Sequence, residues 1–355
     1  MIPVHPTSLW KYLDKKKTPL REGIGHQFYL SWEDSLWDIL RSYKIPESST
    51  VLIPSFFCMD VVSNMKTHGL RAVFYNLDKN LQANQKEVTD LIKLHNPKII
   101  IIFHPVGIRS LLLDSKELLQ FLSSDTILIE DAVHQLINPQ KIEIKRKNHF
   151  ILTSLRKVVP LQGSILFGRK EDVQKLKGSM YIDFSYIMRV LIYWGLMQLF
   201  LSFQKYTALI PIKKFSGKYA EKFMLKGYDV IGDSPFPAWC PSIFSRTYFH
   251  INFEKVKNIK KEQVKMYKKE LKHYHLFFPE KDEEELRGFP IILNKKYADE
   301  FISKIRNEGI CLRKELPDCL WAKKYSIAYL PLGPYLDKCD IGYIISKVNN
   351  IIECR

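Results

Sequence analysis

The sequence has few cysteines, and their spacing excludes two kinds of stabilised fold. Six cysteines occur in 355 residues, with no C-x-x-C pair and no histidine at the spacing of metal ligands. This pattern excludes a disulfide framework and a structural zinc site, and it predicts reduced thiols. The amino-terminal segment also lacks the unbroken apolar core of a signal peptide. We therefore expect a cytoplasmic protein without a bound metal.

Acidic residues are scarce relative to basic ones. The chain has 54 Lys and Arg against 38 Asp and Glu, a formal charge of +16. Such a balance suits nucleic acid, an anionic membrane face or phosphorylated substrates. No zinc finger, helix-turn-helix or basic-aromatic RNA motif accompanies it, so nucleic acid is not an expected partner. The basic run at 255–272 has apolar residues at helical spacing and is interpreted as the solvated face of an amphipathic helix.

Long apolar runs are also missing. The most apolar stretch, Tyr186–Ile210, is broken by Arg189, Gln198, Gln204 and Lys205, and its uncharged pieces are shorter than the roughly 20 residues that span a bilayer. We interpret it as a buried interdomain or dimer-interface helix. The alternative is a helix in the plane of a membrane interface, because its tryptophan, its tyrosines and the basic residues after it fit that pattern too. In that case the protein would lie peripherally at the inner membrane face.

A regular alternation of apolar strands and helices is present from residue 50 onward. Short apolar runs at Val51–Ile53, Ala72–Tyr75, Lys98–Phe103 and Thr126–Ile129 are separated by helical patterns. This is the signature of a mainly parallel sheet covered by helices on both faces. The expected fold class is therefore α/β.

The chain is long enough for two domains. Composition shifts toward polar and basic residues after Pro211. We therefore expect a large domain at 1–214 and a small α+β domain at 215–355, with strands at Phe289–Leu293 and Ile310–Arg313.

Chemically useful side chains follow the predicted strands. His104-Pro105 and Glu130-Asp131 come directly after two of them, and ligands on parallel sheets bind at such strand ends. Lys157 lies in a turn between two further apolar runs. A lysine that forms an imine must be unprotonated part of the time, which burial or a neighbouring cation such as Arg156 favours. Taken alone, a lysine in a turn is more often simply solvated.

Asp131 and His134 strengthen the case for a cofactor. Pyridoxal phosphate is an electron sink only while its ring nitrogen is protonated, and a buried carboxylate facing that nitrogen maintains the proton. His134, one helical turn after Asp131, could reach the phenolic oxygen of the same ring. The alternatives are a helix cap for Glu130 and Asp131 and a histidine satisfied within a helix for His134.

Several motifs together resemble one family, the DegT/StrS family of pyridoxal-phosphate-dependent sugar aminotransferases of fold type I. The lysine follows the serine after two residues and precedes a proline and a glycine turn. The resemblance covers nearly the whole chain, through Pro54–Phe56, His104–Gly107, Ile129–His134, Ser154–Lys157, Phe289–Ile292, Asn307–Ile310 and Leu330–Leu332.

The resemblance implies a role for each matched residue. Lys157 would hold the cofactor and move the proton, Asp131 would pair with the pyridine nitrogen, and His134 would contact the phenolic oxygen. Ser154 would bind the phosphate. The ring-stacking position falls on Phe57 or Cys58, and these two remain alternatives.

The resemblance also implies a reaction and an assembly. The expected substrate is a keto sugar, which the family resemblance implies to be nucleotide-linked, and the expected donor is an amino acid such as glutamate. The expected assembly is a homodimer.

One motif departs from the family pattern. The family commonly has Ser-Gly-Thr at the phosphate, whereas this chain has Ser31-Trp32-Glu33. Loss of the glycine removes close backbone approach, and a carboxylate near a phosphate is unfavourable. Two alternatives stay open. The departure at Trp32 and Glu33 favours a catalytically altered protein of this fold that serves as a binding or regulatory subunit. The apolar stretch Tyr186–Ile210 favours a membrane-peripheral enzyme acting on a lipid-linked substrate.

Overall fold

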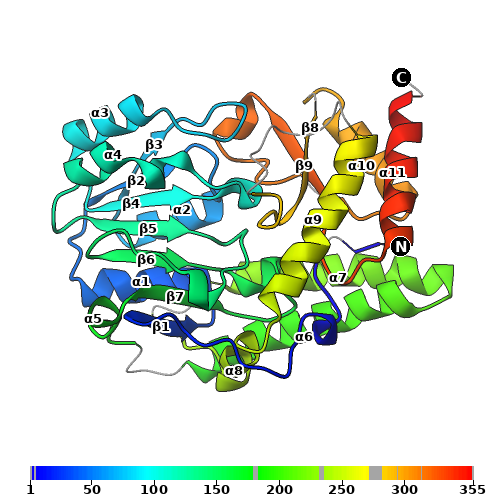
Figure 1. The fold of residues 1–355 in the computed structure, drawn as a ribbon, viewed down its shortest axis with the longest axis horizontal. Helices are drawn as coiled ribbons and strands as arrows, with labels where there is room; N and C mark the ends of the chain where they lie inside the picture. Colours follow the sequence, from blue (N-terminus) through cyan, green and yellow to red (C-terminus); the bar gives the residue numbers. More distant parts are fainter. Residues whose placement is uncertain are drawn as a thin grey trace.

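The computed structural model describes residues 2–3, 5–178, 183–231, 236–271, 282–293, 295–312 and 314–353. Its larger part is a seven-stranded sheet in the order β1-β7-β6-β5-β4-β2-β3 (Figure 1). Strands β2 to β6 run parallel to one another, whereas β7 is antiparallel to both β6 and β1. The strands are β1 (Ile24–Tyr29), β2 (Thr50–Pro54), β3 (Arg71–Tyr75), β4 (Ile99–Phe103), β5 (Ile127–Asp131), β6 (His149–Leu152) and β7 (Ser164–Arg169). The predicted parallel α/β sheet is confirmed.

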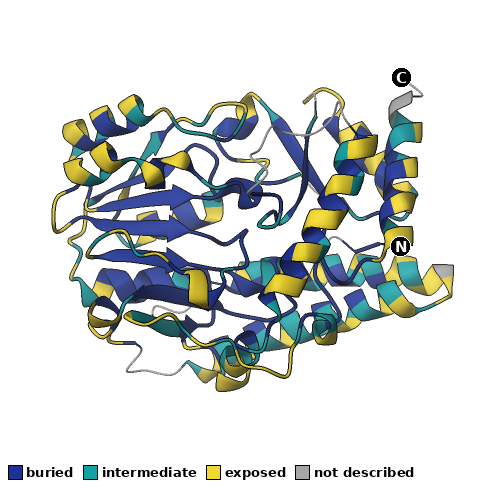
Figure 2. Cartoon of the chain, in the orientation of Figure 1, coloured by how far each residue is buried: buried dark blue, intermediate teal, exposed yellow. Residues whose placement is uncertain are grey.

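Both faces of this sheet are buried, which explains the run of isoleucines in β4. Successive side chains of a strand point to opposite faces. Ile99 and Ile101 join the apolar cluster that contains residues of α1 and α2, whereas Ile100 and Ile102 join the cluster that contains residues of α3 and α4. Figure 2 shows the strands as the buried centre of this part. The helices are α1 (Trp32–Ser42), α2 (Met59–Thr67), α3 (Gln85–His95), α4 (Lys116–Phe121) and α5 (Lys170–Val173).

Strand β1 was not predicted from the sequence. It pairs along its full length with β7, and it lies at the edge of the sheet. Its sequence, IGHQFY, mixes polar and apolar residues. An edge strand needs no continuous apolar run. The strand conformation of β1 therefore depends on its pairing with β7 rather than on its own sequence pattern.

The carboxyl-terminal part contains a second, two-stranded sheet of β8 (Gly288–Leu293) and β9 (Ser326–Pro331). The strand predicted at Ile310–Arg313 is wrong, because Ile310 forms only an isolated bridge with Ile2, while Arg313 lies outside the described residues. The helices around this sheet are α9 (Phe253–Glu270), α10 (Ala298–Asn307) and α11 (Lys338–Glu353), whereas α8 (Ser242–Tyr248) lies near β1 of the larger sheet.

Helix α9 is the basic helix expected at 255–272, but its lysines are not all solvated. Lys257 and Lys260 are buried. Lys257 forms ion pairs with Glu284 and Glu285, and these pairs account for its position away from bulk water. The interpretation as a simple solvated face is therefore wrong for these two residues.

Two long helices, α6 (Phe184–Tyr206) and α7 (Ile210–Val230), lie side by side as a hairpin along one edge of the molecule (Figure 1). The boundary predicted at 214/215 falls within α7, which continues without a break. The two-domain division stays a prediction.

Helix α6 is apolar but largely unburied. By length and composition it could cross a membrane, and only 22% of its apolar window is buried inside the chain. Burial between domains therefore accounts for only one side of this helix. Ile192, Leu199 and Phe203 are exposed on the other side.

Candidate functional site

A cavity of about 690 Å³, counting the part open to solvent, lies at the carboxyl edge of the central strands. Seven of the eight residues proposed from the sequence line it, and they come from four separate segments of the chain. These seven are Glu33, Phe57, Cys58, Asp131, His134, Ser154 and Lys157. Ser31 does not line it. The fold therefore brings the predicted lysine and aspartate into one space.

Asp131 is the last residue of β5, and the strand places it at the edge of the cavity. In the sheet it pairs with Phe103 on one side and Leu152 on the other. The backbone N–H of Val133 donates to Oδ1 at 3.2 Å, and Oδ2 has no hydrogen-bond partner among the described residues. Burial raises the pKa of Asp131 to about 7, although the nearby Lys157 cation partly offsets this rise.

Lys157 is positioned by a tight turn between β6 and β7. Residues Leu155–Lys157 form a short 3-10 turn, and the N–H of Leu155 donates to the carbonyl of Gly163 at 2.9 Å. Gly163 has a φ of +119°, and a Cβ there would lie 2.8 Å from the Cys240 sulfur. Only glycine fits this position without strain, so it defines the end of the turn that presents Lys157.

His134 belongs to a buried polar cluster. The N–H of Val106 donates to Nδ1 at 2.9 Å, so the ring proton of neutral His134 resides on Nε2. Nε2 lies 3.3 Å from Glu315 and 2.9 Å from Arg287. Burial lowers the pKa of His134 to about 3, which keeps the ring neutral. Since both nitrogens have partners, the predicted contact with a phenolic oxygen would require one of them to exchange its partner.

Arg287 and Glu315 were not predicted from the sequence. They come from the carboxyl-terminal part, and the backbone N–H of Arg287 donates to the carbonyl of Val106 at 2.8 Å. Its guanidinium lies 4.7 Å from the ring centre of Tyr329. Neither residue belongs to a local sequence motif. They could have been predicted only by knowing which distant segments of the chain come into contact.

Aromatic rings form the wall around Asp131 and His134. Phe103 lies 5.1 Å from His134 and 6.0 Å from Phe57, and Phe57 lies 6.1 Å from Trp32 between ring centres. Cys58 lines the cavity as the N-cap residue of α2. Both sequence candidates for a stacking position thus face the cavity, and they remain alternatives.

The start of α1 differs from what a phosphate site requires. Ser31 Oγ donates to Asp34 Oδ2 at 2.6 Å and accepts from the Asp34 N–H at 3.0 Å. Asp34 also accepts from the N–H of Ala238 at 2.9 Å. The placement of Ser31 at a phosphate is therefore not supported by the geometry, because its hydroxyl caps the helix instead.

Trp32 and Glu33, which follow this cap, line the cavity. The indole Nε1 of Trp32 is buried without a hydrogen-bond partner in the described part of the chain. This leaves one unused donor and one carboxylate at the same end of the cavity.

Glu130, the neighbour of Asp131, joins three strands from behind the cavity. Its carboxylate lies 2.9 Å from His104 Nε2 and 3.2 Å from His149 Nε2. The Nδ1 atoms of both histidines accept backbone N–H groups, from Ser110 and Lys145. Each ring therefore carries its proton on Nε2, facing Glu130. These bonds hold the end of β5, and with it Asp131, in place.

No family model matches the sequence, and no curated protein matches it either. Solved structures do match. The aminotransferase TlmJ from Streptoalloteichus hindustanus has a TM-score of 0.59 at 11% identity, covering 94% of this chain and 86% of its own. Sugar aminotransferase CalS13 from Micromonospora echinospora has a TM-score of 0.58 at 10% identity, covering 99% and 100%.

A third match is a DegT DnrJ EryC1 StrS aminotransferase from Brucella abortus, with a TM-score of 0.53 at 16% identity, covering 92% of this chain and 85% of its own. At identities this low, the structural matches establish a shared fold and nothing more. The chain therefore has the fold of the DegT/DnrJ/EryC1/StrS aminotransferases, the fold type I arrangement that the sequence motifs resemble.

Proposed function

We propose that this protein is a pyridoxal-phosphate-dependent aminotransferase that transfers an amino group to a keto sugar. The observation that carries the proposal is the presence of Lys157 and buried Asp131 in one cavity. Solved proteins with this fold, the sugar aminotransferase CalS13 among them, support the substrate class. We further propose a nucleotide-linked sugar and an amino acid such as glutamate as donor, because the positive charge of the chain suits a diphosphate.

The residues at the ring end of the cavity fit the cofactor. Asp131 Oδ2 is an acceptor without a partner among the described residues, and it would accept a hydrogen bond from the N–H of a protonated pyridine ring. Aromatic walls at Phe57 and Phe103 suit a planar ring. When bound, the cofactor supplies an electron sink for carbanion chemistry.

The phosphate end offers a different set of donors from a glycine-rich helix start. Ser154 and Arg156 line the cavity. Glu33 opposes an anion there. We propose that Ser154 and Arg156 bind the phosphate in place of the α1 backbone.

Lys157 is the residue we assign to proton transfer. Its Nζ would attach covalently to the cofactor at rest and, once released by the amino donor, would move a proton between carbon atoms of the bound molecule. His134 stays neutral and orients the wall of the site through its bonds to Val106 and Glu315. Asp131 holds a positive charge at the ring nitrogen.

Borohydride trapping tests this proposal. Purified protein incubated with pyridoxal phosphate should show visible absorbance, and reduction should leave the cofactor on the peptide that contains Lys157. Lys157→Ala is the matched control and should trap nothing. Absence of labelling on wild-type Lys157 would falsify the aminotransferase assignment. Labelling without glutamate-dependent turnover of a keto sugar would reject only the proposed substrate and donor.

The second candidate function is a binding or regulatory subunit on the same fold. Glu33 in the cavity and the self-capped start of α1 favour it, because both weaken phosphate binding. In this case the protein would bind the sugar ligand, but it would not hold the cofactor at Lys157 and would not convert the sugar. Equilibrium binding of the keto sugar to Lys157→Ala separates binding from catalysis.

The exposed side of α6 is the surface we assign to assembly. We propose a cytoplasmic homodimer that covers Ile192, Leu199 and Phe203, with contact to the inner membrane face as the alternative. Light scattering and liposome flotation of Leu199→Glu distinguish the two. Loss of a dimer with no lipid binding by wild type supports the first, and wild-type flotation that Leu199→Glu abolishes supports the second.

A further inference from the structure

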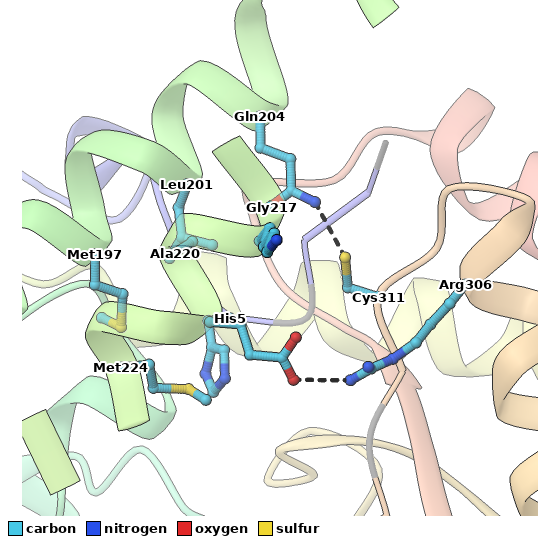
Figure 3. A pocket seen from close by; sticks show the side chains of 11 residues that line it. His5, Met197, Leu201, Gln204, Gly217, Ala220, Met224, Arg306 and Cys311 are labelled. Atoms are coloured by element: carbon cyan, nitrogen blue, oxygen red, sulfur yellow. Dashed lines mark hydrogen bonds and ion pairs between the residues drawn. The ribbon is translucent and has the colours of Figure 1, made fainter. Parts of the chain in front are cut away.

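An apolar cavity lies between α6, α7 and the carboxyl-terminal part, away from Lys157. Its volume is about 660 Å³, counting the part open to solvent. Met197 and Leu201 line it from α6, and Ala220 and Met224 line it from α7 (Figure 3). Methionine walls are flexible and polarisable, so they adapt to apolar ligands of irregular shape.

The polar groups of this cavity are mostly bonded to one another. Gln204 donates to the sulfur of Cys311 at 3.0 Å, and Arg306 pairs with Glu221 at 3.0 Å. Figure 3 shows these two pairs at the side of the cavity opposite Met197. Burial raises the pKa of the Cys311 thiol, which argues against a reactive thiolate. Carbon and sulfur atoms make up most of the remaining surface, and His5 and Lys218 also line it.

A second, narrower space of about 350 Å³, counting the part open to solvent, lies beside this cavity. His5, Met197 and Met224 line both spaces. Arg156 and Tyr228 line the second space and also the Lys157 cavity. The three spaces are therefore neighbours that share wall residues.

Arg156 and Tyr228 form the partition between the last two spaces. The guanidinium of Arg156 lies 4.2 Å from the ring centre of Tyr228. Aromatic residues Tyr193, Trp194 and Phe223 line the middle space. A ligand that reaches Lys157 from the apolar cavity must displace these side chains, and an extended chain displaces fewer of them than a bulky ring system does.

We propose that the space between α6 and α7 binds the hydrocarbon chain of an amphiphilic ligand, and that this chain is the apolar part of the substrate whose keto end reaches Lys157. Binding of the chain stands on the cavity geometry alone. Its assignment to the substrate rests on the proposed function. The exposed apolar residues Ile192, Leu199 and Phe203 lie on the side of α6 opposite Met197 and Leu201, and they suit contact with a lipid surface that carries such a ligand.

A fluorescent chain tests the first half. The probe 11-(dansylamino)undecanoic acid should bind wild-type protein saturably, with increased emission. Ala220→Phe and the larger Ala220→Trp fill the cavity and should weaken binding at least tenfold. Leu225→Phe, on the exposed side of α7, is the matched control and should bind like wild type. No saturable binding, or equal affinity in Ala220→Phe and wild type, overturns the proposal.

The second half needs two keto-sugar substrates, a decyl and a methyl glycoside. Ala220→Phe should raise the KM of the decyl glycoside at least tenfold and leave that of the methyl glycoside unchanged. Equal effects on both overturn the assignment to the substrate. If Lys157 traps no cofactor, the aminotransferase proposal fails, and the probe titration still decides whether the chain site exists. Turnover of the decyl substrate is then compared between anionic vesicles that contain it and free solution. This comparison distinguishes a membrane source from a soluble one.

Discussion

Arg287 Nη1 lies 2.9 Å from each carboxylate oxygen of Glu315, and both side chains are buried beside His134. The Arg287 cation and the bond from His134 hold the pKa of Glu315 well below its usual range. The backbone N–H of Arg287 donates to Val106 in the loop after β4, and its guanidinium lies against His134. The wall of the Lys157 cavity thus depends on an ion pair within the carboxyl-terminal part.

Replacing Glu315 by Gln should strongly destabilise the protein. It leaves the buried Arg287 cation without its counter-charge, a loss of about 3–5 kcal/mol in the free energy of unfolding. Chemical denaturation measures it. The matched control is Glu308→Gln, which removes an ion pair with Lys347 near the surface and should cost less than about 1 kcal/mol. Similar losses for both variants would show that the buried pair has no special role.

Replacing Glu33 by Gln should tighten binding of pyridoxal phosphate. The Glu33 carboxylate lines the cavity at the end assigned to the phosphate and raises the pKa of Asp131. Removing one like charge should improve affinity by roughly fivefold, on the order of 1 kcal/mol. Titration of the cofactor absorbance checks this, with exposed Glu47→Gln as control. An unchanged affinity would place the phosphate elsewhere.

Asp131 predicts a pH dependence of the cofactor-free protein. Its folded pKa of about 7 lies above the ordinary value of 3.8, so the folded state retains a proton that the unfolded chain loses. Stability should therefore fall as pH rises from about 4 to 7, and Asp131→Asn should remove roughly 2–4 kcal/mol of this fall. Urea unfolding at both ends of the window measures the difference. A parallel pH dependence of variant and wild type would contradict the prediction.

Glu130 predicts the opposite sign. His104 and His149 hold the pKa of Glu130 well below its ordinary value of 4.5. Its contribution is present above that value and is lost as pH falls below it. Wild type should exceed Glu130→Gln in stability by about 2–4 kcal/mol near pH 7, and the gap should narrow in acid. The same unfolding series checks it, and a gap that widens in acid would refute it.

Gly163→Ala should misplace the turn that carries Lys157. The added Cβ would meet Cys240 and the Tyr29 carbonyl at a φ of +119°. We expect a loss of at least about 2 kcal/mol and weaker cofactor trapping. Gly342→Ala in α11 is the control, because its Cβ meets nothing within 4 Å. It should stabilise the protein by about 0.5–1 kcal/mol.

Much of the fold follows from local sequence pattern. The strands β2, β4 and β5 are buried on both faces. Each therefore contains an apolar run, Val51–Ile53, Ile99–Phe103 and Ile127–Ile129, that is visible without a structure. The residues that follow a strand are fixed to the sheet edge by its register. Asp131 and Lys157 could therefore be identified as neighbours of one cavity.

Other features depended on which distant segments meet. Edge strand β1 is recognisable only through its pairing with β7. His134 contacts Arg287, which lies 153 positions away in the sequence. Ser31 matched a phosphate motif, yet its hydroxyl caps α1 through Asp34. Local sequence thus determined where strands end and which reactive side chains they carry. Tertiary packing decided the partners of those side chains, because hydrogen bonds and buried charges depend on distances that the order of residues does not contain.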